Sequence, residues 1–181
     1  MALASTLYVF DIDLADSDRG VYESLVVRAA RHPSEAEDFL VARLLAYCRE
    51  YADGIGFSSG LSAPDEPAIF VRDATGELLA WIDIGVPDAA RVHRASKAAP
   101  RVAIYTHKPR GNLIRALAGE RIYRVEALEL IEVDRDLIAR IVHHLRRRMK
   151  LAVSFSGGRA YVAIGDETIE GALENFAPSA A

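Results

Sequence analysis

The sequence predicts one domain of the α/β class, in which helices pack against a sheet. Short stretches alternate apolar and polar residues, as half-buried strands do, and longer stretches repeat apolar residues at helical spacing. The chain has 181 residues, 51% of them hydrophobic, and its mean hydropathy is +0.08. This is enough apolar material for one core. Because the chain has no repeat, linker or low-complexity run, we expect a single domain over residues 1–181.

The first expected elements are two strands and a helix. Thr6–Leu14 alternates in polarity and is followed by turn-forming residues, and a second strand is expected through Leu25–Val27. Ser34 and Glu37 have the spacing of a capping box. In that motif the two side chains accept hydrogen bonds from backbone N–H groups at the start of a helix, which here is expected to run to about Tyr51.

A hairpin and a second helix are expected next. Ala68–Arg72 and Leu78–Gly85 have strand patterns and are joined by a turn at Ala74–Glu77. Asp88 is typical of the residue that begins a helix, and this helix is expected to reach about Ala99.

The second half of the chain continues the alternation of strands and helices. Asp134 is expected to cap a helix whose apolar stripe extends to Met149. The other expected elements are the strand Arg101–His107, a short helix after Asn112, an extended segment Ile122–Val133 and a closing hairpin of Leu151–Phe155 and Ala160–Ile164.

The overall charge limits the classes of partner. Twenty-six acidic residues outnumber 22 lysines and arginines, which gives a net charge of −4. Nucleic acid or anionic lipid would therefore need a local basic patch. No apolar run reaches the roughly 18 residues of a membrane span, and Met1–Ser5 does not open a secretory signal. We expect a soluble cytoplasmic protein whose single cysteine, Cys48, is a small buried hydrophobe.

Asp83 most clearly suggests a site, because it is a carboxylate in an apolar strand. Side chains alternate along Leu78–Gly85, which places Trp81 and Asp83 on one face and Ile82 and Ile84 on the other. Burying an unpaired carboxylate is costly, so we expect it to meet a cation, backbone N–H groups or a metal ion. A structural role, with the carboxylate bonded to the loop after the strand, stays open.

Asp65 and Glu66 form a second acidic feature, between two prolines at the entry of the preceding strand. If the hairpin turns at Gly76, this entry lies across from the end of the Asp83 strand. Two or three converging carboxylates suit Mg²⁺, which takes oxygen ligands in an octahedron. Glu66 is taken as a binding residue of the same site, and a solvated acidic turn is the alternative.

Short strings in the first half of the chain carry a family resemblance: Met1-Ala2-Leu3, Asp16, Asp18-Arg19, His32-Pro33-Ser34-Glu35, Arg43-Leu44-Leu45-Ala46, Gly60-Leu61-Ser62, Asp65-Glu66-Pro67-Ala68, Trp81-Ile82-Asp83-Ile84-Gly85 and Pro87-Asp88. Together they resemble the YaeQ family as far as the strand at Tyr105–Thr106. The resemblance implies a variant of the PD-(D/E)XK nuclease core. That core is an α+β, restriction-endonuclease-like roll, with a mixed β-sheet flanked by helices.

The resemblance also implies roles for single residues. In that superfamily a helix glutamate, an aspartate at a strand entry, and an acidic residue followed two positions later by lysine hold Mg²⁺ and activate water. By this pattern Glu35, Asp65 and Asp83 are the metal ligands and catalytic acids. The chain departs from the pattern at Gly85, which stands where the lysine belongs.

Cations near these acids leave two functions open. Arg94 and Lys97 form a cationic face three residues apart on the next helix, so Lys97 is a candidate for the missing catalytic lysine and Arg94 for a binding residue. Arg43 is taken as a further binding residue, and it could pair with Glu35 or Asp83 without any metal. The first function is Mg²⁺-dependent phosphodiester hydrolysis. The second is a non-catalytic module that binds nucleic acid, a small ligand or a protein through the same charged pocket.

Overall fold

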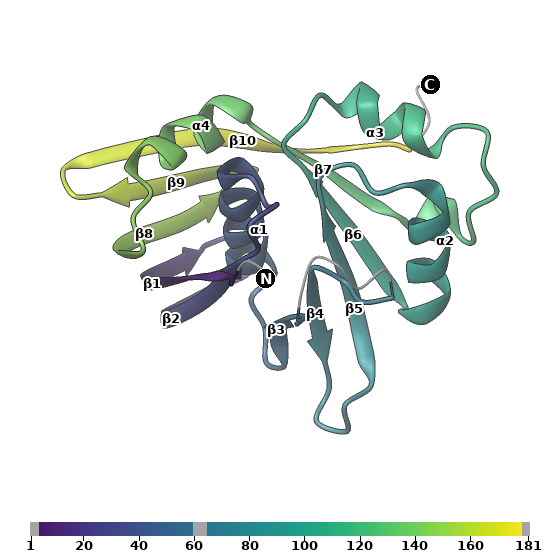
Figure 1. Ribbon diagram of the computed structural model, residues 1–181, viewed down its shortest axis with the longest axis horizontal. Coiled ribbons are helices and arrows are strands. Elements are labelled where there is room, and N and C mark those ends of the chain that lie inside the picture. The colour runs from purple at the N-terminus through teal and green to yellow at the C-terminus, as the bar shows by residue number, and fades with distance from the viewer. Residues whose placement is uncertain (1–3, 60–64, 179–181) are drawn as a thin grey trace.

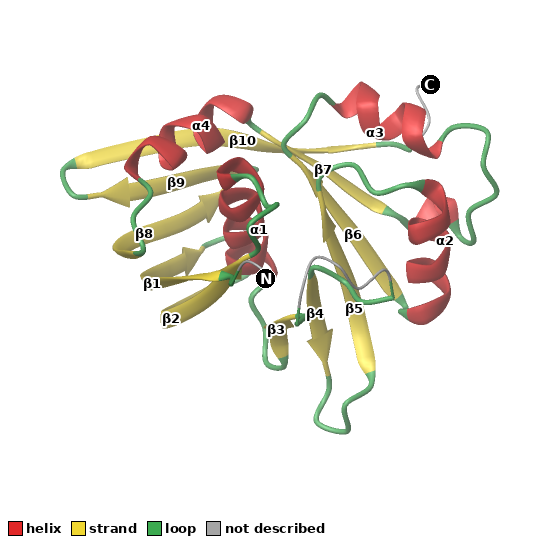
Figure 2. Cartoon of the chain, viewed as in Figure 1, coloured by secondary structure: helices red, strands yellow, loops and turns green. Residues whose placement is uncertain are grey.

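The computed structural model describes residues 4–59 and 65–178, in which ten strands form one mixed sheet flanked by four helices (Figures 1 and 2). The strand order is β2-β1-β8-β9-β10-β7-β6-β5-β4-β3. The strands are β1 (Thr6–Asp16), β2 (Val21–Arg31), β3 (Ile55–Phe57), β4 (Ile69–Arg72), β5 (Leu78–Ile84), β6 (Arg101–Thr106), β7 (Glu129–Val133), β8 (Arg148–Ser156), β9 (Arg159–Ile164) and β10 (Glu167–Phe176). The helices are α1 (Glu37–Glu50), α2 (Ala89–Ala98), α3 (Arg110–Leu117) and α4 (Arg135–His144), with a 3₁₀ turn, η1, at Val125–Ala127.

The sheet curls around α1 (Figure 1). α1 and α4 lie on the inner face, where their apolar side chains join those of both sheet halves in the larger core; Phe10, Leu45, Ile82 and Leu137 are fully buried there. α2 and α3 cover the outer face of β5, β6 and β7, where a second apolar cluster contains Trp81. α1 and α2 therefore contact opposite faces of β5, as the alternation along this strand predicts.

The strands β5, β6 and β7 are parallel neighbours, and α2 and α3 connect them. Their carboxyl ends consequently meet at one edge of the sheet, where β5 continues into Gly85 and β6 into His107. Gly85 has a φ of +86°, and its N–H donates to Tyr105 O over 2.8 Å. In open α/β sheets this edge is the usual place for a ligand.

Two predicted helix caps are confirmed. Asp88 precedes α2 and accepts a hydrogen bond from Arg91 N, and Asp134 precedes α4 and accepts one from Asp136 N. The predicted hairpin of β4 and β5 is also confirmed as an antiparallel pair.

The predicted capping box at α1 is wrong. α1 begins at Glu37, and the residue before it, Ala36, makes no side-chain cap. A tight turn, in which Glu35 N donates to His32 O over 2.8 Å, leaves Ser34 two residues outside the cap position. The Ser34 hydroxyl lies 2.6 Å from His32 Nδ1 instead.

The predicted extension of α4 to Met149 is also wrong. α4 ends at His144, and Leu145 N donates to Val142 O in an extended C-cap. Met149 lies in β8, where it shares the buried face with Leu151 and alternates with the exposed Lys150. The apolar residues of this region fit both a helical and an alternating pattern, and the pairing of β8 with β1 decides between them.

The strand β10 was not predicted. Its alternation is weak because glycine and half-buried residues interrupt it, yet it joins the two halves of the sheet by pairing with both β9 and β7. Two of the strings that carry the family resemblance, Met1–Leu3 and Gly60–Ser62, and the proline before Asp65 lie outside the described residues.

Candidate functional site

A cavity of about 570 Å³ lies at the amino-terminal end of α1, along the carboxyl ends of β5 and β6. We call it the α1 N-terminal pocket. Its volume falls in the range of small-molecule sites, roughly 300–1,000 Å³. Its lining residues are Ser34, Glu35, Ala36, Asp38, Phe39, Arg43, Ser58, Glu66, Pro67, Ala68, Asp83, Ile84, Gly85, Val86, Pro87, Arg91, His107 and Lys108.

Asp83 is buried at this pocket and accepts four hydrogen bonds. Its Oδ1 accepts from Arg91 Nη2 at 2.8 Å and from Ala68 N at 3.2 Å. Its Oδ2 accepts from Arg91 Nε at 2.7 Å and from Trp81 Nε1 at 2.9 Å. An ionised carboxylate offers about four lone-pair positions, so these donors use its full capacity.

The cation that pairs with Asp83 is Arg91, and sequence reasoning missed it. Asp83 lies on the outer face of β5, toward α2, whereas Arg43 belongs to α1 on the inner face. The hydrogen bonds to Asp83 hold the pKa of the Arg91 guanidinium above its ordinary value. The sequence does contain a signal for this pair. Arg91 is the first cation of the helix that follows the Asp83 strand, and that helix starts close to the end of the strand.

Glu35 and Arg43 form a buried pair on the other side of the pocket, 3% and 6% exposed. Arg43 Nη2 lies 3.0 Å from Oε1 and 3.1 Å from Oε2, donates to Oε2, and also donates to Ala30 O at 2.9 Å. His32 N donates to the same Oε2 at 3.2 Å. Burial raises the pKa of Glu35, an effect that the Arg43 charge only partly offsets. The alternative in which Arg43 pairs with Glu35 is therefore the one observed.

His107 and Lys108, at the end of β6, complete the pocket and were not predicted. His107 Nε2 lies 3.3 Å and Lys108 Nζ 2.7 Å from Asp38 Oδ2. Burial lowers the pKa of His107, so its imidazole is neutral near pH 7. Their position directly after a buried parallel strand is the sequence signal that would have found them.

Three buried polar atoms have no hydrogen-bond partner within the described residues: Glu35 Oε1, Arg43 Nε and His107 Nδ1. All three belong to residues that line the α1 N-terminal pocket. Most buried polar groups in folded proteins are paired, and exceptions often mark a functional region.

The other predicted site residues divide into two groups. Glu66 lines the pocket, where its backbone oxygen accepts from Arg91 Nη2 at 2.7 Å. Asp65 has an 84% exposed side chain with Arg94 Nε 3.7 Å away, and Lys97 is exposed on α2. Asp65, Arg94 and Lys97 do not line the pocket. In the described part of the chain, no group of three or more His, Cys, Asp or Glu residues is placed to hold a metal ion.

The backbone conformation at residue 85 explains why glycine, and not the lysine of the motif, stands there. At a φ of +86°, Gly85 adopts a conformation that side-chain-bearing residues rarely take. A lysine here would strain the turn that brings β5 to the pocket. The ammonium group that does line the pocket is that of Lys108.

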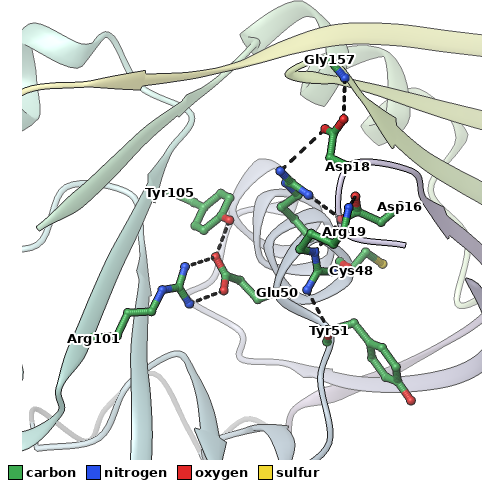
Figure 3. Close-up of polar contacts among 10 residues, drawn as sticks. Asp16, Asp18, Arg19, Cys48, Glu50, Tyr51, Arg101, Tyr105 and Gly157 are labelled. Atoms are coloured by element: carbon green, nitrogen blue, oxygen red, sulfur yellow. Dashed lines mark hydrogen bonds and ion pairs between the residues drawn. The ribbon is translucent and has the colours of Figure 1, made fainter. Parts of the chain in front are cut away.

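A second cavity, of about 460 Å³, lies at the opposite end of α1. Beside it a group of buried acids and arginines joins α1 to both halves of the sheet (Figure 3). We call this group the α1 C-terminal network, and its members are Asp16, Arg19, Arg49, Glu50, Arg101 and Tyr105.

Both buried acids of this network accept three hydrogen bonds. Asp16 Oδ2 accepts from Arg49 and, at 2.7 Å, from Arg19 Nε, and its Oδ1 accepts from Arg19 N at 3.1 Å. Glu50 accepts two bonds from Arg101, at 2.5 and 3.0 Å, and one from the Tyr105 hydroxyl at 2.5 Å. Burial and the Glu50 charge raise the pKa of Tyr105, which keeps its proton on the hydroxyl.

Comparison with known proteins assigns the family. The model of the family described as "YaeQ protein" matches residues 1–173. The chain belongs to the YaeQ family. The YaeQ protein of Escherichia coli (strain K12) is 28% identical over 171 residues, 94% of each chain, and that of Salmonella typhi is 36% identical over 110 residues, 61% of each.

Two solved YaeQ structures have the same fold. The crystal structure of the YaeQ protein from Pseudomonas syringae matches with a TM-score of 0.83 and 32% identity, covering 95% of this chain and 96% of that one. The YaeQ structure from Xanthomonas axonopodis pv. citri matches with a TM-score of 0.86 and 27% identity, covering 96% and 98%. Among the described helices, none is long and apolar enough to cross a membrane.

Proposed function

We propose that this YaeQ protein is a binding module, and that the α1 N-terminal pocket holds a small polar molecule. The observation that supports this most strongly is the location of the three buried atoms without a hydrogen bond, since all belong to residues of this pocket. Glu35 Oε1 still has the Arg43 charge 3.0 Å away, whereas a buried polar atom with no partner, such as Arg43 Nε or His107 Nδ1, costs about 1–3 kcal/mol. A ligand that reached these groups through a small side-chain rearrangement would recover part of that cost.

The pocket walls fit this proposal. Phe39, Ile84, Val86 and Pro87 supply apolar surface, and the paired cations and acids between them supply a few placed polar groups. Small-molecule sites typically combine these two kinds of surface. In this proposal the carboxylates orient the arginines: Asp83 fixes the Arg91 guanidinium through two hydrogen bonds.

Mg²⁺-dependent phosphodiester hydrolysis is the second candidate function, with nucleic acid as its substrate. One observation favours it: Glu35 and Asp83 line the same pocket, and Lys108 adds an ammonium group. This candidate requires Mg²⁺ to displace Arg91 from Asp83, because all four lone-pair positions are in use. The nuclease-like classification of the fold and the cytoplasmic location stay predictions.

A fragment screen by ¹H–¹⁵N NMR tests the binding proposal. We expect small polar aromatic or heterocyclic fragments to shift resonances of residues 34–43, 83–91 and 107–108. Val86→Glu should weaken these hits because Val86 lines the pocket, and Leu7→Glu, which changes an exposed aliphatic residue on β1, should not. Shifts scattered over the surface, or hits equally weakened in both variants, would refute the proposal. Cleavage of DNA or RNA that needs Mg²⁺ and disappears in Asp83→Asn would support hydrolysis instead.

A further inference from the structure

The two ends of the sheet differ in how much backbone they expose. β3 forms one end with three residues, and β2 forms the other with eleven. β2 pairs with β1 residue by residue along its whole length, from Val21 opposite Asp16 to Arg31 opposite Thr6. A long, regular edge strand without proline is a ready template for another strand.

The direction of the backbone groups on β2 follows from the neighbouring strands. Val9 N donates to Arg147 O, just before β8, so the odd-numbered residues of β1 direct their backbone groups toward β8 and the even-numbered ones toward β2. In the observed register, even-numbered residues of β1 lie opposite odd-numbered residues of β2. The N–H and C=O groups of Ser24, Val26, Arg28 and Ala30 consequently point outward, along the edge of the sheet, where Ala30 O also accepts from Arg43 Nη2 at 2.9 Å.

Three exposed apolar side chains lie beside this edge. Of the six large hydrophobic residues classed as exposed in the described chain, three lie on β1 and β2: Leu7, Tyr22 and Val26, at 52%, 64% and 56%. The register places all three on the outer face of the sheet. The helices on that face, α2 and α3, cover β5, β6 and β7 instead.

The charges of β2 favour a second copy of the same strand as the partner. Glu23 lies near the start of β2, and Arg31 lies at its end. In antiparallel pairing about a two-fold axis at Val27, Glu23 falls opposite Arg31 of the second copy on the same face of the sheet. Parallel pairing in register would place like charges together.

We propose that β2 pairs antiparallel with β2 of a second copy of this chain, with the two-fold axis at Val27. The two ten-stranded sheets then join edge to edge. Val27 lies opposite its own copy, and the outward backbone groups of Val26 bond to those of Arg28 in the second copy.

Sedimentation equilibrium from micromolar to millimolar protein concentration tests association. We expect wild type to shift from monomer to dimer. Val26→Lys places a lysine opposite Arg28 of the second copy and should weaken dimerisation about tenfold. Leu7→Lys is the matched control, since it changes an exposed aliphatic residue of the same face on β1, and should leave dimerisation unchanged. A wild type that is monomeric throughout, or equal effects of the two variants, would overturn the proposal.

Cross-linking tests the register. Mild oxidation with copper phenanthroline should convert the double variant Val26→Cys/Arg28→Cys into a covalent dimer, because both positions are exposed and the axis places Val26 opposite Arg28 of the second copy. The matched double variant Ser24→Cys/Val26→Cys, also at exposed positions, should stay monomeric on a non-reducing gel, because its cysteines lie opposite residues 30 and 28 of the second copy. Wild type, whose single Cys48 is buried, should also remain uncross-linked. Equal cross-linking of both double variants, or of Ser24→Cys/Val26→Cys alone, would reject the proposed axis.

Discussion

Both ends of α1 carry buried acids and arginines, but the two ends differ in how many of the buried polar atoms make hydrogen bonds. In the α1 C-terminal network, Asp16 and Glu50 each accept three hydrogen bonds from protein donors. At the α1 N-terminal pocket, Glu35, Arg43 and His107 each keep one buried polar atom that makes no hydrogen bond among the described residues, although Glu35 Oε1 lies 3.0 Å from Arg43 Nη2.

On this difference we base the proposal that the network has a structural role and the pocket a functional one. A buried ion pair in which every carboxylate oxygen accepts a hydrogen bond holds its elements together, and here it ties α1 to β1 and β6. A buried pair with unused polar atoms carries a cost in the unliganded protein. A ligand would therefore gain more from the second arrangement.

The largest effect on stability is expected from a change in the α1 C-terminal network. Asp16→Asn removes the charge that neutralises Arg19 and Arg49 around a fully buried position, and should lower the free energy of unfolding by about 3 kcal/mol in urea titrations. Asp13→Asn changes an exposed aspartate on the same strand and should stay within about 0.5 kcal/mol of wild type. Equal losses in the two variants would remove the structural role of the network.

The next largest effect is expected from removing the hydrogen bond that Trp81 donates to Asp83. Trp81→Phe keeps the aromatic packing against α2 and removes one hydrogen bond to a buried carboxylate. We expect a loss of about 2 kcal/mol in the free energy of unfolding, followed by circular dichroism. A variant as stable as wild type would show that the carboxylate does not depend on this donor.

Acid should act on the two ends in opposite directions. Burial raises the pKa of Asp16, but the hydrogen bonds from Arg19 and Arg49 outweigh it and hold the pKa below its ordinary value. The stability from this group is present above the ordinary aspartate pKa and is lost as pH falls through the lower folded value. Burial holds the pKa of Glu35 above its ordinary value, so protonation as pH falls through that value relieves a cost.

Two variants make this contrast measurable when the free energy of unfolding is followed from neutral to acid pH. Asp16→Asn should lose less stability than wild type as the pH falls, because the charge that is titrated is gone. Glu35→Gln should lose more stability than wild type, because protonation of Glu35 can no longer relieve the cost of its burial. The same change of slope in both variants would contradict the contrast.

The smallest expected effects are those of Lys108 and Lys97 on the pKa of His107. Lys108 lies beside His107 and lowers its pKa, after the larger effect of burial, so Lys108→Ala should raise the His107 pKa in an NMR titration. Lys97→Ala should leave it unchanged, because Lys97 does not line the pocket. Both variants should stay within about 0.5 kcal/mol of wild-type stability. A His107 pKa that responds to Lys97 would bring that lysine back to the site.

Sequence reasoning found Asp83 because strand alternation is local, and one carboxylate in an apolar strand is visible in a short window. The family resemblance pointed to Glu35, and the acidic pair between two prolines pointed to Glu66; both residues line the same pocket as Asp83. Arg91 and His107 were missed because their role depends on which strand ends meet at one edge. That arrangement follows from the parallel pairing of β5 and β6, which no short window contains.

The errors in the fold have a similar origin. Met149 fits a helix by spacing and a strand by alternation, and only the pairing of β8 with β1 selects the strand. The long strand β10 has a weak pattern of its own and is held by its neighbours on both sides. Elements with strong local patterns and caps, such as α2 after Asp88, were predicted correctly.

Thermal unfolding of wild type and Asp83→Asn, each with and without Mg²⁺, tests the central claim most directly. If Asp83 serves to orient Arg91, the variant should melt at a lower temperature, and Mg²⁺ should shift neither protein, since the four donors already occupy the carboxylate. A Mg²⁺-dependent rise in the melting temperature of wild type that is absent from Asp83→Asn would contradict the account and establish a metal site.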